Sequence, residues 1–371
     1  MTQDDNNDDG EIYLDAITGL LQPLLTALEA LTFAGRHLHP PQLPQLVEQV
    51  AEWEAPVREG LEAFQAVDWP DRVAGFAEQM ETAAIAVCRA FEGLRAAVEQ
   101  PDGIRLAYRA TRQTGRAVAA LYPLAANLPP ISRFFLEESA RDDEALLQRL
   151  EAAERGREGV GVIHAGNDKG SRGGFSMYVP EYYDAEQAHP LIMALHGGTG
   201  HGRDFLWAWL AEARTRGAIL VSPTSRGDTW SLMGPDVDSE HIEGILAFVG
   251  ERWNIDPERL LLTGMSDGGT FAYVSGLRAE SPFTHLAPIS ASFHPLLLEM
   301  VDRERIRGLP IYLTHGALDW MFAIDIARTA KQALQAAGAD LHYREIADLS
   351  HTYPRDENPR IMDWFLSAAT P

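Results

Sequence analysis

One serine in the sequence stands in a setting that suits nucleophilic catalysis. Ser266 lies in residues 264–268, which read Gly-Met-Ser-Asp-Gly, directly after the apolar run 260–263 and before a helical stretch. A strand-to-helix turn this tight crowds the neighbours of the serine, and glycine has no Cβ to clash there. The free amides at the start of the helix would favour developing negative charge. We therefore predict that Ser266 is a nucleophile, against the alternative of a helix-capping serine.

A serine hydroxyl is barely ionised at neutral pH and needs a general base. In chains with this serine turn, an acid and then a histidine follow in order. Asp319 comes just after the apolar run 310–316, and His351 lies in a loop after the last predicted strand. Both then stand at the carboxyl edge of a parallel sheet, where catalytic groups gather. Asp348 is a competing acid, but it is only three residues from His351 and follows no strand end in the right place, so we predict that Asp319 orients His351.

A second glycine-rich run would supply the donors that an acyl-transfer oxyanion needs. Residues 195–200 read Leu-His-Gly-Gly-Thr-Gly between a predicted strand and a predicted helix. We expect one donor to be the amide of Gly198, with Thr199 as the fallback, and the other to be the amide of Asp267. A nucleotide-phosphate loop is the alternative, but the spacing of GxGxxG and the lysine of a P-loop are absent. We expect His196 to be structural.

Aromatic residues fall near these loops and suggest the nature of the substrate. Trp230 and Trp320 are predicted in loops or at strand ends, so we take both, with Thr199, as candidates for substrate contact. Some of the aromatic residues must belong to the core, as large aromatic side chains usually do. An aromatic-lined groove would suit aryl or polyester-type esters, which we state as a hypothesis.

The spacing of apolar residues along the chain changes near residue 155. Up to that point, apolar residues recur at spacings of three and four, and the breaks predict about five helices in an all-α bundle. Beyond it, short apolar runs alternate with amphipathic stretches, which predicts a mostly parallel sheet with helices on both faces. We therefore expect a helical domain over 1–155, serving as a lid or an oligomerisation domain, and a catalytic domain over 156–371.

Composition limits the partners. The net charge of −23 argues against nucleic acid and anionic membranes. No stretch reaches about 18 consecutive apolar residues, so we predict no membrane span. The N-terminus has no basic start with an apolar run, so we expect a cytoplasmic protein. His37 and His39 have no further ligand at metal-binding spacing, and we predict neither a metal nor a cofactor.

Residues from about 160 to 368 resemble the esterases related to polyhydroxybutyrate depolymerases and feruloyl esterases, and also the phospholipase/carboxylesterase group. The resemblance rests on the runs 195–202 (LHGGTGHG), 264–269 (GMSDGG) and 315–319 (HGALD), and on His351. It implies an α/β-hydrolase fold, preceded here by the helical domain. This family often has asparagine after the nucleophile, whereas this chain has Asp267.

These observations predict a carboxylic-ester hydrolase that works through a Ser-His-Asp triad and an acyl-enzyme intermediate. Its substrate would be a small-molecule or polymeric ester, and the helical domain could join copies into a homo-oligomer. A serine peptidase or acylaminoacyl hydrolase is an alternative, because the same triad cleaves amides. A binding protein without catalysis on a hydrolase scaffold is another.

Overall fold

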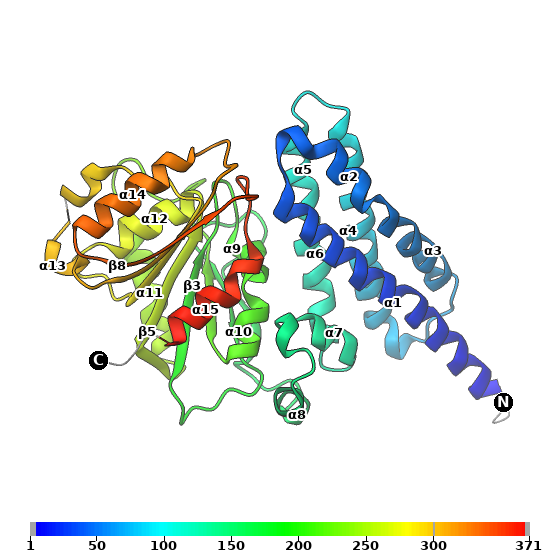
Figure 1. Cartoon of the computed structure of the whole chain (residues 1–371). Coiled ribbons are helices and arrows are strands. Elements are labelled where there is room, and N and C mark those ends of the chain that lie inside the picture. Colours follow the sequence, from blue (N-terminus) through cyan, green and yellow to red (C-terminus); the bar gives the residue numbers. More distant parts are fainter. Residues whose placement is uncertain (1–4, 300, 368–371) are drawn as a thin grey trace. The chain divides into compact units, whose positions relative to one another are not determined.

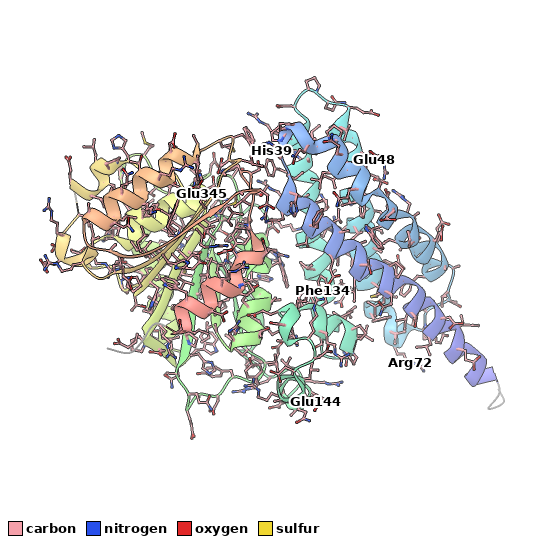
Figure 2. All side chains as sticks on the ribbon, in the orientation of Figure 1. His39, Glu48, Arg72, Phe134, Glu144 and Glu345 are labelled. Atoms are coloured by element: carbon pink, nitrogen blue, oxygen red, sulfur yellow. The ribbon has the colours of Figure 1, made fainter. Side chains whose placement is uncertain are left out.

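The computed structural model describes residues 5–299 and 301–367. The chain divides into two compact units, Met1–Phe135 and Leu136–Pro371. Phe134 ends the last helix of the first unit, and Glu144 begins the first long helix of the second (Figure 2). The division therefore falls about twenty residues before the boundary expected from the sequence.

The first unit is all helical (Figure 1). Its α-helices in chain order are α1 (Asp5–His37), α2 (Leu43–Val50), α3 (Glu54–Gln65), α4 (Ala74–Val98), α5 (Gly103–Thr111), α6 (Gln113–Leu121) and α7 (Pro129–Phe134). The long α4 packs against α3, α5 and α6, and α1 packs along α3. Leucines at one face of α1 are fully buried in this bundle, among them Leu20, Leu24 and Leu28. The bundle is thus divided more finely than the five or so helices expected from the sequence.

Helix α1 is long and apolar. Among the described residues, its segment Gly10–His37 is the one helix with the length and composition to cross a membrane. In its most apolar stretch 39% of the residues are buried within the protein. A core helix of a water-soluble protein passes the same test, so this is weak evidence for a span. The sequence expectation missed this segment because occasional polar residues interrupt its apolar run.

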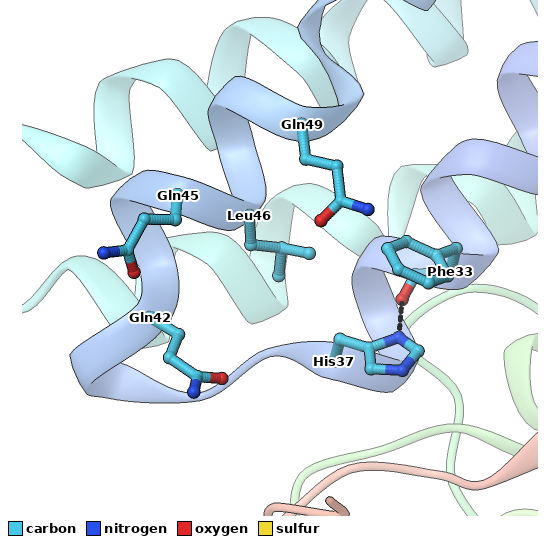
Figure 3. Close-up of a pocket in the computed structure, with 6 residues that line it drawn as sticks. All are labelled: Phe33, His37, Gln42, Gln45, Leu46 and Gln49. Carbon is cyan, nitrogen blue, oxygen red and sulfur yellow. Dashed lines mark hydrogen bonds between the residues drawn. The ribbon is translucent and has the colours of Figure 1, made fainter.

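A cavity of about 310 Å³ lies in the first unit, between the end of α1 and the start of α2 (Figure 3). Its lining consists of Phe33, His37, Gln42, Gln45, Leu46 and Gln49. The Nδ1 of His37 is 2.9 Å from the carbonyl oxygen of Phe33, which accepts its hydrogen bond. These six residues include no nucleophile and no carboxylate, so the cavity does not have the groups for hydrolytic catalysis.

The second unit contains one eight-stranded sheet in the order β1-β2-β4-β3-β5-β6-β7-β8. The strands are β1 (Gly161–Ala165), β2 (Phe175–Val179), β3 (His189–Leu195), β4 (Ile219–Pro223), β5 (Ile255–Met265), β6 (His285–Ile289), β7 (Pro310–Gly316) and β8 (Asp340–Ile346). Strand β2 runs antiparallel to β1 and β4, and the other pairs are parallel. The mostly parallel sheet predicted from the sequence is confirmed.

Helices cover both faces of this sheet (Figure 1). Helices α10 (Leu210–Arg216) and α15 (Asn358–Ser367) pack together on one face. Helices α11 (Ser239–Gly250), α12 (Asp267–Gly276) and α14 (Ile324–Ala336) cover the other, and the unit also contains the short helices α9 (Gly202–Phe205) and α13 (Arg303–Ile306). The second unit has the α/β-hydrolase fold. Because β3, β5, β7 and β8 are parallel, their carboxyl ends meet at one edge.

The segment before β1 belongs to the second unit because of what it contacts. Leu146 of α8 (Glu144–Ala152) packs in a small apolar cluster against Tyr182, and the guanidinium of Arg149 lies 4.7 Å from the centre of the Tyr182 ring. Glu137 accepts hydrogen bonds from Nε and Nη2 of Arg216 on α10, at 2.8 and 2.9 Å. A helical pattern in the sequence does not reveal such packing, which explains the later boundary predicted there.

Candidate active site

Ser266 occupies the sharp turn between β5 and α12. Its backbone has φ 56° and ψ −118°, and its amide donates to the carbonyl oxygen of Ile289 at 2.9 Å. A positive φ is costly for a residue with a Cβ and persists only where the surroundings enforce it. The side chain is 8% exposed and stands at the carboxyl edge of the sheet. This is the strained serine turn that the sequence predicted.

Backbone crowding explains the two glycines that flank the serine. A Cβ on Gly264 would lie 2.6 Å from the backbone carbonyl carbon of Gly268. A Cβ on Gly268 would lie 2.4 Å from the carbonyl oxygen of Leu195 at the end of β3. Contacts this close to rigid backbone cannot be relieved by a rotamer change. The glycines therefore allow the serine turn to pack directly on residues 195–200, where the sequence predicts an oxyanion donor and which we call the oxyanion loop.

The structure brings His351 between Ser266 and Asp319. The Nε2 of His351 is 3.0 Å from Oγ of Ser266, and its Nδ1 is 2.9 Å from Oδ2 of Asp319. All three side chains are buried. The carboxylate on the histidine is thus that of Asp319, as the sequence predicted, and not that of Asp348. In this arrangement Nδ1 donates to the acid while Nε2 can accept the serine proton.

Asp319 is held firmly by its own loop. Its Oδ1 accepts hydrogen bonds from the amides of Met321 and Phe322, at 2.9 and 2.8 Å. The ring of Phe322 meets that of His351 edge to face, with 5.2 Å between centroids. The loop after β7 therefore fixes both the acid and the orientation of the imidazole.

A second buried histidine lies beside the acid. The Nε2 of His315 is 2.8 Å from the carbonyl oxygen of Phe322 and 3.4 Å from Oδ2 of Asp319. Burial lowers the pKa of His315 below its ordinary value, which favours a neutral ring that donates from Nε2. The sequence did not single out His315, whose contact with Asp319 depends on the packing of the loop after β7.

The loop after β3 forms a tight turn beside the serine. The amide of Gly200 donates to the carbonyl oxygen of Gly197 at 3.0 Å, and Thr199 has φ 55°. The amide of Thr199 donates to the carbonyl oxygen of Asp228 at 3.2 Å. Thr199 is therefore unsuited as the fallback oxyanion donor, because its amide already has an acceptor. The amide of Gly198 therefore stays the donor that we expect from this loop.

Asp267 lies against the same loop. A Cβ on Gly198 would stand 2.7 Å from Oδ2 of Asp267, so the carboxylate packs on this glycine. The hydroxyl of Thr229 donates to the same oxygen at 2.6 Å. Asp267 begins α12, and the first amides of a helix have no partner within it. The amide of Asp267 therefore has no acceptor within α12, and its side chain contacts two neighbouring loops.

Trp230 is not placed as the sequence suggested. It is 2% exposed, its Nε1 donates to the carbonyl oxygen of His196 at 2.7 Å, and its ring stacks on Phe271. The indole is therefore part of the core and supports the strand that carries the oxyanion loop, which corrects the expectation of substrate contact. His196 is also buried, and its Nε2 accepts from the amide of Ser225 at 3.1 Å, in keeping with a structural role.

Trp320 has the exposure that a substrate contact requires. It is 44% exposed directly after Asp319, and its neighbours Leu318 and Met321 are 37% and 51% exposed. We call these three exposed apolar residues, which lie within two positions of Asp319 in the chain, the rim. Among the described residues, no group of three or more histidine, cysteine or acidic side chains is arranged to hold a metal ion.

No family model matches the chain. The chain is 27% identical over 176 residues to a bifunctional acetylxylan esterase/xylanase from Neocallimastix patriciarum, covering 46% of this chain and 25% of that protein. It is 30% identical over 140 residues to a probable feruloyl esterase C from Aspergillus oryzae, covering 35% of this chain and 49% of the relative. The resemblance to feruloyl esterase-like enzymes is confirmed.

Solved structures give a more distant likeness. A thermostable esterase aligns with a TM-score of 0.46 and 18% identity, over 55% of this chain and 62% of the other. A ferulic acid esterase aligns with a TM-score of 0.46 and 16% identity, over 55% of this chain and 96% of the other. The chain spans about half the length, or less, of the two curated relatives described above.

Proposed function

We propose that this protein is a serine esterase that hydrolyses carboxylic esters through an acyl-enzyme. The observation that supports this most is the continuous hydrogen-bonded chain from Ser266 through His351 to Asp319. In the first step His351 takes the hydroxyl proton as Ser266 attacks the ester carbonyl, and a tetrahedral oxyanion forms. The imidazolium then gives this proton to the leaving alcohol, and water releases the acid by the reverse route.

Two backbone amides would receive the oxyanion, those of Gly198 and Asp267. Both belong to elements that the serine turn holds together, so they need no rearrangement when the negative charge develops. Asp319 keeps Nδ1 of His351 protonated and stabilises the imidazolium. Its two bonds from backbone amides keep the carboxylate in place during both steps.

The substrate class is proposed from the rim beside Asp319. Trp320 and its exposed neighbours offer an apolar and aromatic surface next to the acid, which suits an aryl or polyester-type acyl group. The similarity to a probable feruloyl esterase C supports the same substrate class, because that name describes an aromatic acyl ester. The alcohol component could be small or part of a polymer.

The proposed function is tested by removing the nucleophile, which should abolish formation of the acyl-enzyme. Wild-type protein is expected to hydrolyse p-nitrophenyl acetate and to be labelled by a fluorophosphonate probe, whereas Ser266→Ala is expected to fold and do neither. Ser290→Ala is the matched control, because Ser290 is another buried serine with a positive φ but lies one strand away from the nucleophile turn. Esterase activity retained by Ser266→Ala would overturn the assignment.

A panel of substrates then separates ester from amide hydrolysis. Methyl ferulate, p-nitrophenyl butyrate and an acylaminoacyl p-nitroanilide present aromatic acyl, aliphatic acyl and amide groups to the same serine. We expect turnover of both esters, with the higher kcat/KM on the aromatic acyl ester, and none of the anilide. Preference for the anilide would indicate a peptidase.

A further inference from the structure

Arg172 contacts both of the loops that surround the proposed oxyanion site. It lies in the segment before β2, outside every sequence motif described above. Its Nη1 donates to the carbonyl oxygen of Gly200 at 2.7 Å, and its Nε donates to that of Gly227 at 2.8 Å. Its Nη2 donates to the hydroxyl of Ser225. One guanidinium therefore joins the oxyanion loop to the loop that follows β4.

The 197–200 turn contains a strained residue and needs hydrogen bonds from neighbouring segments to hold it. Thr199 is β-branched and has φ 55°, a conformation that such residues rarely adopt. A strained residue of this kind persists only where its neighbours hold it. The bond from the amide of Thr199 to Asp228 is one restraint, and the bond from Arg172 to Gly200 is the next one along the chain.

The loop after β4 is itself anchored to the catalytic elements. The amide of Ser225 donates to Nε2 of His196 at 3.1 Å, and the hydroxyl of Thr229 donates to Oδ2 of Asp267 at 2.6 Å. This loop thus connects the start of the oxyanion loop to the residue after the nucleophile. Arg172 adds a direct connection between the loop after β4 and Gly200, so hydrogen bonds restrain the chain on both sides of Gly198.

We propose that Arg172 is a positioning residue, which holds the 197–200 turn so that the amide of Gly198 points at the developing oxyanion. The inference rests on the proposed esterase function. It adds to the proposed site a residue that acts through the backbone of the 197–200 turn. The rigid fork of the guanidinium makes three hydrogen bonds at once, which a lysine ammonium cannot reproduce in the same geometry. The geometry of the fork, more than its positive charge, is the contribution of Arg172.

The first experiment compares Arg172→Lys with Arg203→Lys. Arg203 is a neighbouring arginine whose contacts are weaker, at 3.5 Å from a backbone oxygen and 3.7 Å from the Asp168 carboxylate. With p-nitrophenyl acetate, Arg172→Lys is expected to lower kcat by about 10- to 100-fold with KM changed less than about 2-fold, because a donor misplaced by about 1 Å can cost that much. Arg203→Lys is expected to keep kcat within about 2-fold of wild type.

The second experiment asks whether Arg172 acts through the strained turn. Glycine at position 199 adopts φ 55° without steric cost, so a Thr199→Gly chain needs the restraint less. We expect the fold-loss in kcat caused by Arg172→Lys to be at least about 5-fold smaller in the Thr199→Gly background than in the native one. An equal loss in both backgrounds would mean that Arg172 does not hold this turn.

A milder variant covers the case in which Arg172→Lys does not fold. Ser225→Ala removes the acceptor of Nη2, together with the bond that the Ser225 hydroxyl donates to the carbonyl oxygen of Gly227, and leaves the charge and the other two bonds of Arg172 in place. It is expected to keep the melting temperature within a few degrees and to lower kcat several-fold at constant KM. If Ser225→Ala and a folded Arg172→Lys both keep wild-type kcat, the inference is overturned.

The outcomes separate this inference from the proposed function. Wild-type protein that neither hydrolyses p-nitrophenyl acetate nor reacts with a fluorophosphonate probe would overturn the function, and the role of Arg172 with it. Active wild type combined with an unaffected Arg172→Lys would overturn only the role of Arg172. Equal losses for Arg172→Lys and Arg203→Lys would do so too.

Discussion

At the scale of single residues, the site depends on which atom of a side chain is already engaged. His351 uses Nδ1 for Asp319 and turns Nε2 toward Ser266, which is the tautomer that a general base requires. The amide of Thr199 is committed to Asp228, whereas Trp320 is exposed beside the acid. Existing hydrogen bonds and exposure decide which of several chemically suitable residues can take part in the proposed reaction.

The choice between two acids gives a direct prediction at this scale. Asp319→Asn removes the charge that stabilises the imidazolium and favours the wrong tautomer of His351, so kcat should fall by about 10³- to 10⁴-fold. Asp348→Asn is the matched control and should keep kcat within about 3-fold, since Asp348 is not the partner of Nδ1. Steady-state kinetics with p-nitrophenyl acetate measure both. A larger loss in Asp348→Asn would reverse the assignment of the acid.

At the scale of elements, the serine turn depends on direct contact between the backbone of α12 at Gly268 and that of β3 at Leu195. Gly268→Ala would place a methyl group 2.4 Å from the carbonyl oxygen of Leu195, so β3 and α12 would have to separate. We expect a loss of about 1–3 kcal/mol in the free energy of unfolding and of most activity, as for other overpacked sites. Urea unfolding and kinetics measure the two effects.

A second glycine serves as the control for that change. Gly244 lies inside α11, and a Cβ there would meet no heavy atom within 4 Å. Gly244→Ala should therefore raise the free energy of unfolding by about 0.5–1 kcal/mol through helix propensity and leave kcat unchanged. Equal destabilisation by both substitutions would show that backbone contact at Gly268 is not the cause.

A buried carboxyl on α10 makes the stability of the second unit depend on pH. Burial raises the pKa of Glu212 to about 7, while nearby Arg355 and a bond with Asn358 favour the charged form and Glu137 opposes it. The folded protein therefore holds this proton more tightly than the unfolded chain, whose glutamate has a pKa of about 4.5. The free energy of unfolding should fall as the pH rises through this interval and stay low above about 7.

Glu212→Gln tests this effect because it keeps the shape and removes the titration. The shift corresponds to at most about 3 kcal/mol, so the variant should be more stable than wild type at pH 8 and nearly equal to it at pH 5. Urea unfolding at the two pH values gives the comparison. The same stability difference at both pH values would contradict the assignment to Glu212.

At the scale of the whole molecule, the position of the unit boundary has a measurable consequence. A chain of residues 136–371 keeps Glu137 with Arg216 and the cover over Tyr182, whereas a chain of residues 157–371 loses both. We expect the shorter chain to melt at a temperature lower by roughly 5 °C or more, because the partly buried Arg216 loses Glu137 and keeps only Asp363, and because Tyr182 loses its apolar cover. Calorimetry of the two shortened chains decides this. Equal melting temperatures would place the boundary nearer 155.

The role of the helical unit can be tested with the longer of these chains. If the helical unit serves as a lid, which is one of the two roles expected from the sequence, its removal should change the ratio of kcat/KM between methyl ferulate and p-nitrophenyl acetate. An unchanged ratio would reject the lid and leave oligomerisation as the role. Sedimentation of the full chain and of residues 136–371 then measures that alternative directly.

Local sequence determined the elements and the chemical groups of this protein. The glycines around Ser266, the apolar runs before Asp319 and the order of serine, acid and histidine were readable, because turn sterics and hydrophobic periodicity act over short stretches. The alternation of runs likewise predicted the parallel sheet, which in turn predicted that His351 would meet the other two residues.

Only the tertiary structure decided which groups are exposed, engaged or restrained. Trp230 and Trp320 look alike in the sequence, yet one is 2% exposed in the core and the other 44% exposed at the rim. Arg172 reaches Gly200 and Gly227 across 28 and 55 residues of chain, and no local pattern marks it. Exposure and long-range hydrogen bonds arise when distant segments pack together, so they depend on the whole fold and not on the neighbours of a residue in the chain.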